Sequence, residues 1–291
     1  MVRQLLSPGQ MSIHFRPPAS LDQLRAKHSA FMERSWKDRP LAELAQEFAK
    51  VYGELFVLPL ELTCREMGCN ELHRARWLDP QAEDVSDPLT FSYPRDPAKQ
   101  VLGRANLPGA PAFYTCGEAF SSMYEARKPE LGKELFHSEW IFNDDRTWKV
   151  VVMIPLERLE KKDVPFHRKW ENAFREALLQ SGIPDDHFVL YYNCLVELFH
   201  LEEHNLPAWM AHTIMRKQEM ADVLLYPSLM TDTRTLCHAF HTSPIDRGRI
   251  LLNKVSRLPM GVESEHPASI GRVRNGRIDW SAETPSIRRT A

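Results

Sequence analysis

The architecture of this chain is best predicted from Gly103-Arg104-Ala105-Asn106-Leu107-Pro108-Gly109-Ala110-Pro111-Ala112-Phe113-Tyr114, a stretch that Glu125 follows. The glycine indicates a turn, residues 110–116 predict a strand, and residues 118–128 predict a helix. Within 23 residues the chain offers a guanidinium, an aromatic ring and a carboxylate. These groups can hold a diphosphate, stack on a flat ring and stabilise a sugar cation. The stretch therefore predicts a site for a nucleotide with a cleavable glycosidic bond.

The composition is typical of a globular protein. The 291 residues suffice for one large domain or two modest ones, with 43% hydrophobic and 26% charged residues. A net charge of -2 argues against a duplex nucleic-acid partner, which requires a clustered basic face. The N-terminus lacks the apolar core of a signal peptide, and the apolar stretches 51–62 and 150–156 are too charged or too short to cross a bilayer. We expect a cytoplasmic protein with no membrane partner.

The cysteines and histidines do not form a known metal motif. The cysteines are Cys64, Cys69, Cys116, Cys194 and Cys237. They contain no CxxC pair, so we expect reduced thiols packed as small apolar groups. His200 and His204 lie at i and i+4 of a predicted helix, but Leu201 stands where the HExxH motif has its glutamate. We expect no bound metal.

The first 65 residues predict a loose arm followed by a helical hairpin. Residues 1–19 show no periodicity, whereas Ser20 is a good N-cap residue with Gln23 three positions later. Pro40 suits the first turn of a second helix, in which apolar residues recur at helical spacing up to Leu55. We expect this hairpin either to pack on the main domain or to bind a partner.

Residues 66–260 predict one domain with mixed secondary structure. Strands are expected over residues 110–116, 148–156, 223–227 and 250–255, and helices over 118–128, 160–182, 189–203 and 208–220. Strands and helices do not alternate regularly, which favours an α+β class over a doubly wound sheet. The GxGxxG and GxxxxGK[ST] loops are absent. We expect residues 71–103 to be irregular and the arginine-rich tail, 261–291, to be solvated or loosely docked.

The order of these motifs resembles that of the RES domain family. Its members carry a GR-x-N turn, a strand ending in an aromatic pair, and a glutamate one helix later. This chain also has Tyr226-Pro227-Ser228 downstream, and Leu72-His73-Arg74-Ala75-Arg76 upstream, where the family shows an aromatic residue followed by arginine. The resemblance spans residues 70–258. It departs at Ala105, where many members have tryptophan, and at His73, where tyrosine is common.

This resemblance implies an ADP-ribosyltransferase-like RES domain, here with an N-terminal helical extension. Studied members of the family are bacterial toxins that consume NAD, often paired with an antitoxin that blocks the pocket. Some hydrolyse or phosphorolyse NAD, and others transfer ADP-ribose to a protein. For this chain the resemblance therefore implies NAD as substrate and an antitoxin as partner. The choice between hydrolysis, phosphorolysis and transfer stays open, as does the oligomeric state.

The same resemblance assigns roles to single residues. The expected catalytic residues are Glu125, Arg104, Tyr114 and Ser228, and the expected NAD-binding residues are Arg74, Arg76, Gly103, Asn106 and Tyr226. One carboxylate suffices for this chemistry, because nicotinamide leaves from an already cationic ring and needs no acid. Arg104 would clamp the diphosphate, and either Arg74 or Arg76 would add a second contact. Asn106 would fix the turn itself.

Each role has a structural alternative. Arg104 could pair with a surface aspartate, Tyr114 could be a core strand residue, and Ser228 could cap a helix. Glu125 could lie on a solvated helix face. Two further classes of function also stay open: a binding module that holds a nucleotide or a protein without turnover, and a nucleic-acid binder that uses the basic tail.

Overall fold

The computed structural model describes residues 20–126, 132–160, 164–181, 183–231, 235–258 and 269–282. The predicted arm over residues 1–19 lies outside the described residues, as do the two ends of the predicted tail. The strands are β1 (Pro59–Leu62), β2 (Glu71–Leu78), β3 (Phe113–Cys116), β4 (Glu134–Phe142), β5 (Trp148–Val152), β6 (Val223–Pro227), β7 (Leu236–Phe240), β8 (Ile250–Leu258), β9 (Ser269–Arg274) and β10 (Arg277–Ala282). The helices are α1 (Leu21–Met32), α2 (Leu41–Tyr52), α3 (Ala119–Glu125), α4 (Leu156–Glu160), α5 (His167–Ser181), α6 (Asp185–Phe199), α7 (Asn205–His212) and α8 (Ser243–Asp246).

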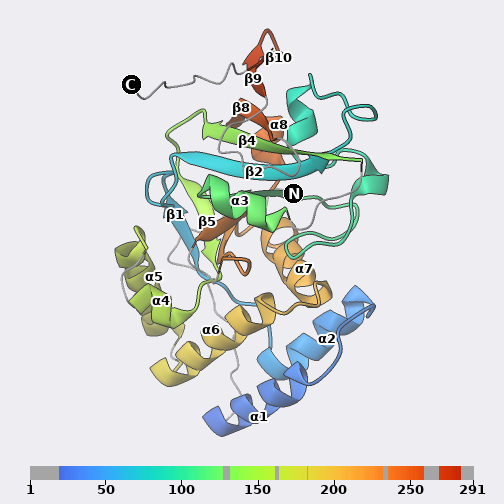
Figure 1. Cartoon of the computed structure of the whole chain (residues 1–291). Helices are drawn as coiled ribbons and strands as arrows, with labels where there is room; N and C mark the ends of the chain where they lie inside the picture. Colours follow the sequence, from blue (N-terminus) through green and yellow to red (C-terminus); the bar gives the residue numbers. More distant parts are fainter. Residues whose placement is uncertain are drawn as a thin grey trace, which may run out of the picture.

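The strands form one mixed sheet in the order β1-β5-β6-β7-β3-β2-β4-β8-β9-β10. The pair β5 and β6 runs parallel, and the other neighbours run antiparallel. In Figure 1, α1, α2, α6 and α7 gather below the sheet and α3 lies against β2. Helices combined with a large mixed sheet confirm the predicted α+β class. Each described helix is too short or too polar to cross a membrane.

The core has two apolar clusters on opposite faces of the sheet. On β5, Val151 belongs to the cluster that α1, α2, α6 and α7 cover, whereas Val150 and Val152 belong to the other cluster. Neighbouring residues of a strand point to opposite faces, so the alternation places one cluster on each side. Both faces of the central strands are therefore buried, which is why β6 is apolar along its whole length.

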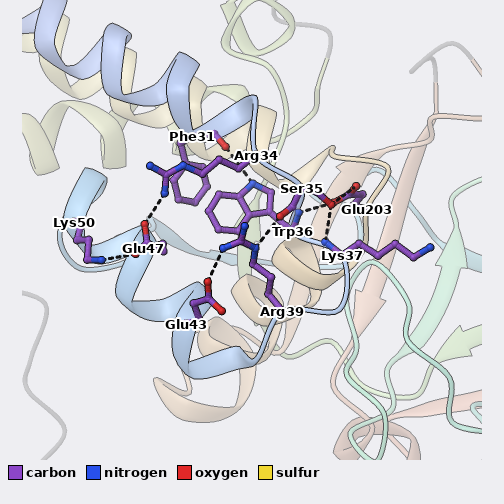
Figure 2. Close-up of polar contacts among 10 residues, drawn as sticks. All are labelled: Phe31, Arg34, Ser35, Trp36, Lys37, Arg39, Glu43, Glu47, Lys50 and Glu203. Atoms are coloured by element: carbon purple, nitrogen blue, oxygen red, sulfur yellow. Dashed lines mark hydrogen bonds and ion pairs between the residues drawn. The ribbon is translucent and has the colours of Figure 1, made fainter.

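The predicted helical hairpin exists and packs on the main domain. The Ser20 hydroxyl accepts a hydrogen bond from the Gln23 amide at 3.2 Å, which confirms the N-cap. The helices α1 and α2 contact α6 and α7, and their aromatic side chains belong to the same cluster as the central strands. Figure 2 shows the connecting loop. Its Trp36 stacks on Phe31 of α1, with ring centroids 4.1 Å apart.

The structure corrects four expectations. Residues 71–78, expected to be irregular, form β2, and the strands β1, β4 and β7 lie where no strand is expected. The predicted tail is not loosely docked over residues 269–282, because β9 pairs with β8 and β10 pairs with β9. The hairpin turns at Asn275 (φ 48°) and Gly276 (φ 76°), a pair that suits a tight hairpin turn. The helix expected from residue 189 begins earlier, at Asp185.

The sheet is weakly joined at its centre. The strands β2 and β3 pair at one position, His73 with Cys116, whereas β2 and β4 pair along eight. The two central strands therefore diverge from this point. Several of the predicted site residues come together at this gap, whereas Arg76 and Asn106 do not line it.

Candidate functional site

Two adjoining cavities lie where β2 and β3 diverge. The first, the strand cavity, measures about 240 Å³ and is bounded by β2, β3, α3 and β7. The second, the loop cavity, measures about 660 Å³ and is bounded by residues 102–104, 202–204 and 229–230. Tyr114, Glu125 and Tyr226 line both. The loop cavity has a volume in the range that small molecules and cofactors occupy, and the strand cavity adjoins it.

Glu125 and Ser228 are in direct contact at the boundary of the two cavities. Glu125 ends α3, and Ser228 directly follows β6. The fully buried Ser228 hydroxyl donates to Glu125 Oε1 at 2.5 Å, and it accepts from the Met230 amide at 3.2 Å. A bond this short is typical of a hydroxyl donating to a carboxylate. The fold thus joins two predicted catalytic residues that lie 103 positions apart.

The glycine turn is locked by Tyr114. The Tyr114 hydroxyl donates to Asn106 Oδ1 at 2.8 Å and accepts from the Ala105 amide at 2.7 Å. A Cβ atom on Gly103 would lie 2.5 Å from Asn106 Oδ1, so only glycine fits there. Asn106 also donates to the carbonyl of Val101 at 2.8 Å, and it lies outside the residues that line the two cavities.

These contacts separate turn residues from cavity residues. Asn106 fixes the turn, as expected from its residue type, and is not at the cavity surface. Tyr114 lines both cavities, and its hydroxyl holds the turn. Burial raises the pKa of Tyr114, so the hydroxyl stays protonated and keeps donating.

Arg104 is anchored at the end of α6. Its Nη1 donates to the carbonyls of Phe199 at 2.7 Å and Leu201 at 3.1 Å. The last carbonyls of a helix lack partners within the helix, and a cation there also offsets the negative end of the helix dipole. The side chain lines the loop cavity together with Glu202 and His204. Arg104 is thus a fixed cation in the cavity wall.

The structure distinguishes the two upstream arginines. Arg74 lines the strand cavity, and its Nη1 donates to the carbonyl of Tyr114 at 2.7 Å across the gap between β2 and β3. Its Nε is buried and has no hydrogen-bond partner among the described residues. Arg76 instead donates to the carbonyls of Thr90 and Ser92 and lies outside the residues that line the two cavities. Burial lowers the pKa of Arg74 to about 9, so it remains a cation at neutral pH.

Several residues in the cavity walls are not predicted from the sequence. Cys116 and Cys237 line the strand cavity, with their sulfur atoms 3.2 Å apart. Cys116 lies two positions after Tyr114 on one strand, a spacing that places both on the same face and could have identified it. Cys237 lies on β7, which the sequence does not predict. Glu202 and His204 line the loop cavity from a segment predicted to be partly helical.

The histidines considered as metal ligands do not share a helix. His200 caps the end of α6 and His204 precedes α7, so no single helix presents both side chains on one face. Among the described residues, no group of three or more His, Cys, Asp or Glu side chains could hold a metal ion.

No protein-family model matches this chain, and a comparison with curated proteins finds no match either.

Proposed function

We propose that this protein is a cytoplasmic RES-type enzyme that cleaves the nicotinamide–ribose bond of NAD. The observation that carries the proposal is the position of Glu125, which lies on the boundary of the two cavities and accepts a hydrogen bond from Ser228. A carboxylate fixed between two binding spaces can act on a bond that joins two halves of a ligand. The finer fold assignment, an ADP-ribosyltransferase-like RES domain, belongs to the same proposal.

In this proposal the two cavities hold different parts of NAD. The strand cavity, which Tyr114 and Tyr226 line, takes the nicotinamide, because an aromatic side chain can contact its flat ring. The loop cavity takes the rest of the dinucleotide, with its diphosphate near Arg104, whose planar fork suits phosphate oxygens. Arg74 supports a polar ligand in the strand cavity, because a buried unpaired N–H is costly and gains from an acceptor. Arg76 has no part in this proposal.

The reaction needs little acid or base chemistry. The bond between ribose C1′ and the ring nitrogen breaks, and its electron pair neutralises the pyridinium, which releases nicotinamide. The positive charge that develops on the ribose is stabilised by the Glu125 carboxylate. Ser228 keeps this carboxylate in place through the bond to Oε1. Water, phosphate or a protein side chain then forms the new bond to C1′ and loses its proton.

We propose that a protein inhibitor covers the surface near the site. Leu229 and Met230, which line the loop cavity, expose 40% and 48% of their surface. On α3, the helix that carries Glu125, Phe120 and Tyr124 expose 60% and 48%. Exposed apolar side chains close together are typical of interaction sites. They support the proposal of an antitoxin that covers the cavities.

The decisive test is an assay of nicotinamide release. The purified full-length protein, freed of any co-purifying partner, is incubated with NAD in the presence and absence of phosphate, and products are separated by chromatography. Release without phosphate indicates hydrolysis, release that requires phosphate indicates phosphorolysis, and transfer of label from NAD to a protein indicates ADP-ribosylation. NAD binding in a calorimeter with no release under any condition would contradict the enzyme and favour the binding module.

A further inference from the structure

Two cysteines lie directly opposite each other on neighbouring strands. Cys116 on β3 pairs in register with Cys237 on β7, and their sulfur atoms are 3.2 Å apart. The next pair along, Gly117 and Leu236, is joined by a backbone hydrogen bond of 3.0 Å. Hydrogen-bonded and non-hydrogen-bonded pairs alternate along antiparallel strands, so the cysteines occupy a non-hydrogen-bonded pair, in which the strands approach most closely.

This position suits a disulfide bond. The Cα atoms of a non-hydrogen-bonded pair are about 4.5 Å apart, which lies at the short end of the range that disulfides span. A sulfur–sulfur bond is about 2.0 Å long, so the two sulfur atoms must approach by only about 1 Å. Rotation of the two side chains can supply that movement without loss of a backbone hydrogen bond.

The pair is part of the strand cavity and touches the proposed catalytic carboxylate. Both cysteines line that cavity, and the Cys237 thiol donates to Glu125 Oε1 at 3.9 Å. Cys194 lies elsewhere, buried on α6, and Cys69 contacts His238 Nε2 at 3.6 Å. The cavity thus offers a route by which a small oxidant can reach a thiol pair that is otherwise buried.

We propose that Cys116 and Cys237 form a redox-active thiol pair that closes to a disulfide within the strand cavity. With hydrogen peroxide, one sulfur attacks an oxygen, which gives a sulfenic acid and one water. The second sulfur then displaces the hydroxyl group, which forms the sulfur–sulfur bond and a second water. The two sulfurs are oxidised and the peroxide is reduced. A small disulfide oxidises the pair equally, by two exchange steps that release two thiols.

Closure of this bond changes the surroundings of Glu125. It removes the thiol hydrogen that Cys237 donates to Oε1 and moves its sulfur toward Cys116. The hydrogen bond with Cys116 and burial both hold the pKa of Cys237 well above its usual range. Because the thiolate is the reactive form, oxidation is slow at neutral pH and becomes faster as the pH rises. The oxidised protein then loses nicotinamide release, a consequence that rests on the proposed function.

The disulfide itself is tested without any assay of activity. The folded full-length protein is treated with hydrogen peroxide or oxidised glutathione, alkylated, digested without reduction and analysed by mass spectrometry. We expect one peptide pair that joins residues 116 and 237 and lacks two hydrogen atoms, in the wild type and in Cys194→Ala. Separate alkylation of both cysteines in the treated wild type would overturn the proposal.

The effect on the site is tested by the ratio of nicotinamide release before and after oxidation. We expect a loss in the wild type and in Cys194→Ala that dithiothreitol reverses, and no change of this ratio in Cys116→Ala or Cys237→Ala. Thermal melting shows which of the two variants is folded and can be used. A cross-link with an unchanged ratio would overturn the regulatory effect. A reduced wild type with no release at all would instead overturn the proposed function, while the mass spectrum still reports on the thiol pair.

Discussion

Some polar side chains of the N-terminal hairpin form short-range pairs at the surface, whereas polar side chains in the walls of the two cavities form half-buried contacts between distant segments. Figure 2 shows the first kind in the ion pairs of Arg39 with Glu43 and of Lys50 with Glu47, each within one turn of a helix or its flank. The second kind is the contact of Glu125 with Ser228. Exposed pairs contribute little to stability, whereas buried ones hold groups in place.

Glu203 links the two regions. Glu203 accepts hydrogen bonds from the Trp36 amide at 2.7 Å and from the Ser35 hydroxyl at 3.1 Å (Figure 2). Its neighbours Glu202 and His204 line the loop cavity, and Arg104 binds the carbonyl of Leu201 in the same segment. The hairpin therefore supports the far wall of the cavity, although it contributes none of the lining residues of the loop cavity.

The hairpin should be most sensitive to loss of its buried aromatic packing. Trp36 is 1% exposed, stacks on Phe31 and donates its indole N–H to the Phe31 carbonyl. We expect Trp36→Ala to lower the free energy of unfolding by about 3–5 kcal/mol, since it leaves a large cavity. Urea unfolding followed by circular dichroism measures this. The control Leu41→Ala, at a position 40% exposed, should change little, and equal losses in both would contradict packing as the main stabiliser.

In the cavity wall, the largest effect of a substitution should instead be on the rate of nicotinamide release. We expect Glu125→Gln to reduce nicotinamide release by about 10²–10³-fold, because it removes the charge that faces the developing cation. The glutamine oxygen still accepts from Ser228, so the unfolding curve should stay unchanged. Glu118→Gln, at the other end of α3, is the matched control. A Glu125→Gln enzyme with wild-type turnover would refute the mechanism.

Acid should destabilise the folded protein through the buried side chain of His238. His238, 1% exposed on β7, has its pKa lowered to about 4 by burial, against about 6.5 when unfolded. Between these values the unfolded chain binds the proton and the folded chain does not, so stability is lost as the pH falls from 6.5 to 4. From His238 alone we expect about 2 kcal/mol between pH 7 and pH 5. The midpoints of urea unfolding of the wild type and of His238→Gln at both pH values measure this loss of stability. An equal loss between pH 7 and pH 5 in the two proteins would contradict the role of His238.

The sequence predicts the local elements that carry the candidate site residues better than it predicts the contacts between them. Arg104, Tyr114 and Glu125 stand close together in a turn, a strand and a helix whose local patterns are clear. The contact of Glu125 with Ser228 depends on how β6 and β7 enter the sheet, which no local pattern encodes. The anchoring of Arg104 on carbonyls at the end of α6 is equally non-local.

The missed strands have physical reasons as well. In β2 the two positions between Leu72 and Leu78 on the same face are Arg74 and Arg76, whose half-buried side chains donate to backbone carbonyls. Charged residues at inward positions remove the apolar alternation by which strands are recognised. The dipeptide Asn275-Gly276 is typical of a hairpin turn and could have predicted the hairpin of β9 and β10. The high arginine content around it instead favours a solvated tail.

The glycine turn offers a smaller and more local test. An added Cβ at Gly103 would lie 2.5 Å from Asn106 Oδ1 and 2.9 Å from the Tyr114 hydroxyl. We expect Gly103→Ala to cost about 1–3 kcal/mol, because the turn must shift to relieve this overlap. Gly117→Ala is the control, since the nearest atoms to its Cβ would be 3.8 Å away. Thermal unfolding compares the two, and a neutral Gly103→Ala would show that the turn is not locked.

The smallest effect is expected at the surface of the hairpin. Lys50 pairs with Glu47 in the last turn of α2, and its side chain is 67% exposed. Water and salt screen such a pair, and ordering two long side chains costs entropy. We expect Lys50→Ala to shift the melting temperature by less than about 2 °C, since alanine is also the better helix former. Calorimetry at low and high salt measures the shift. A larger loss at low salt that disappears at high salt would mean that the surface pairs do stabilise the hairpin. The contrast with the half-buried contact of Glu125 and Ser228 would then be one of degree only.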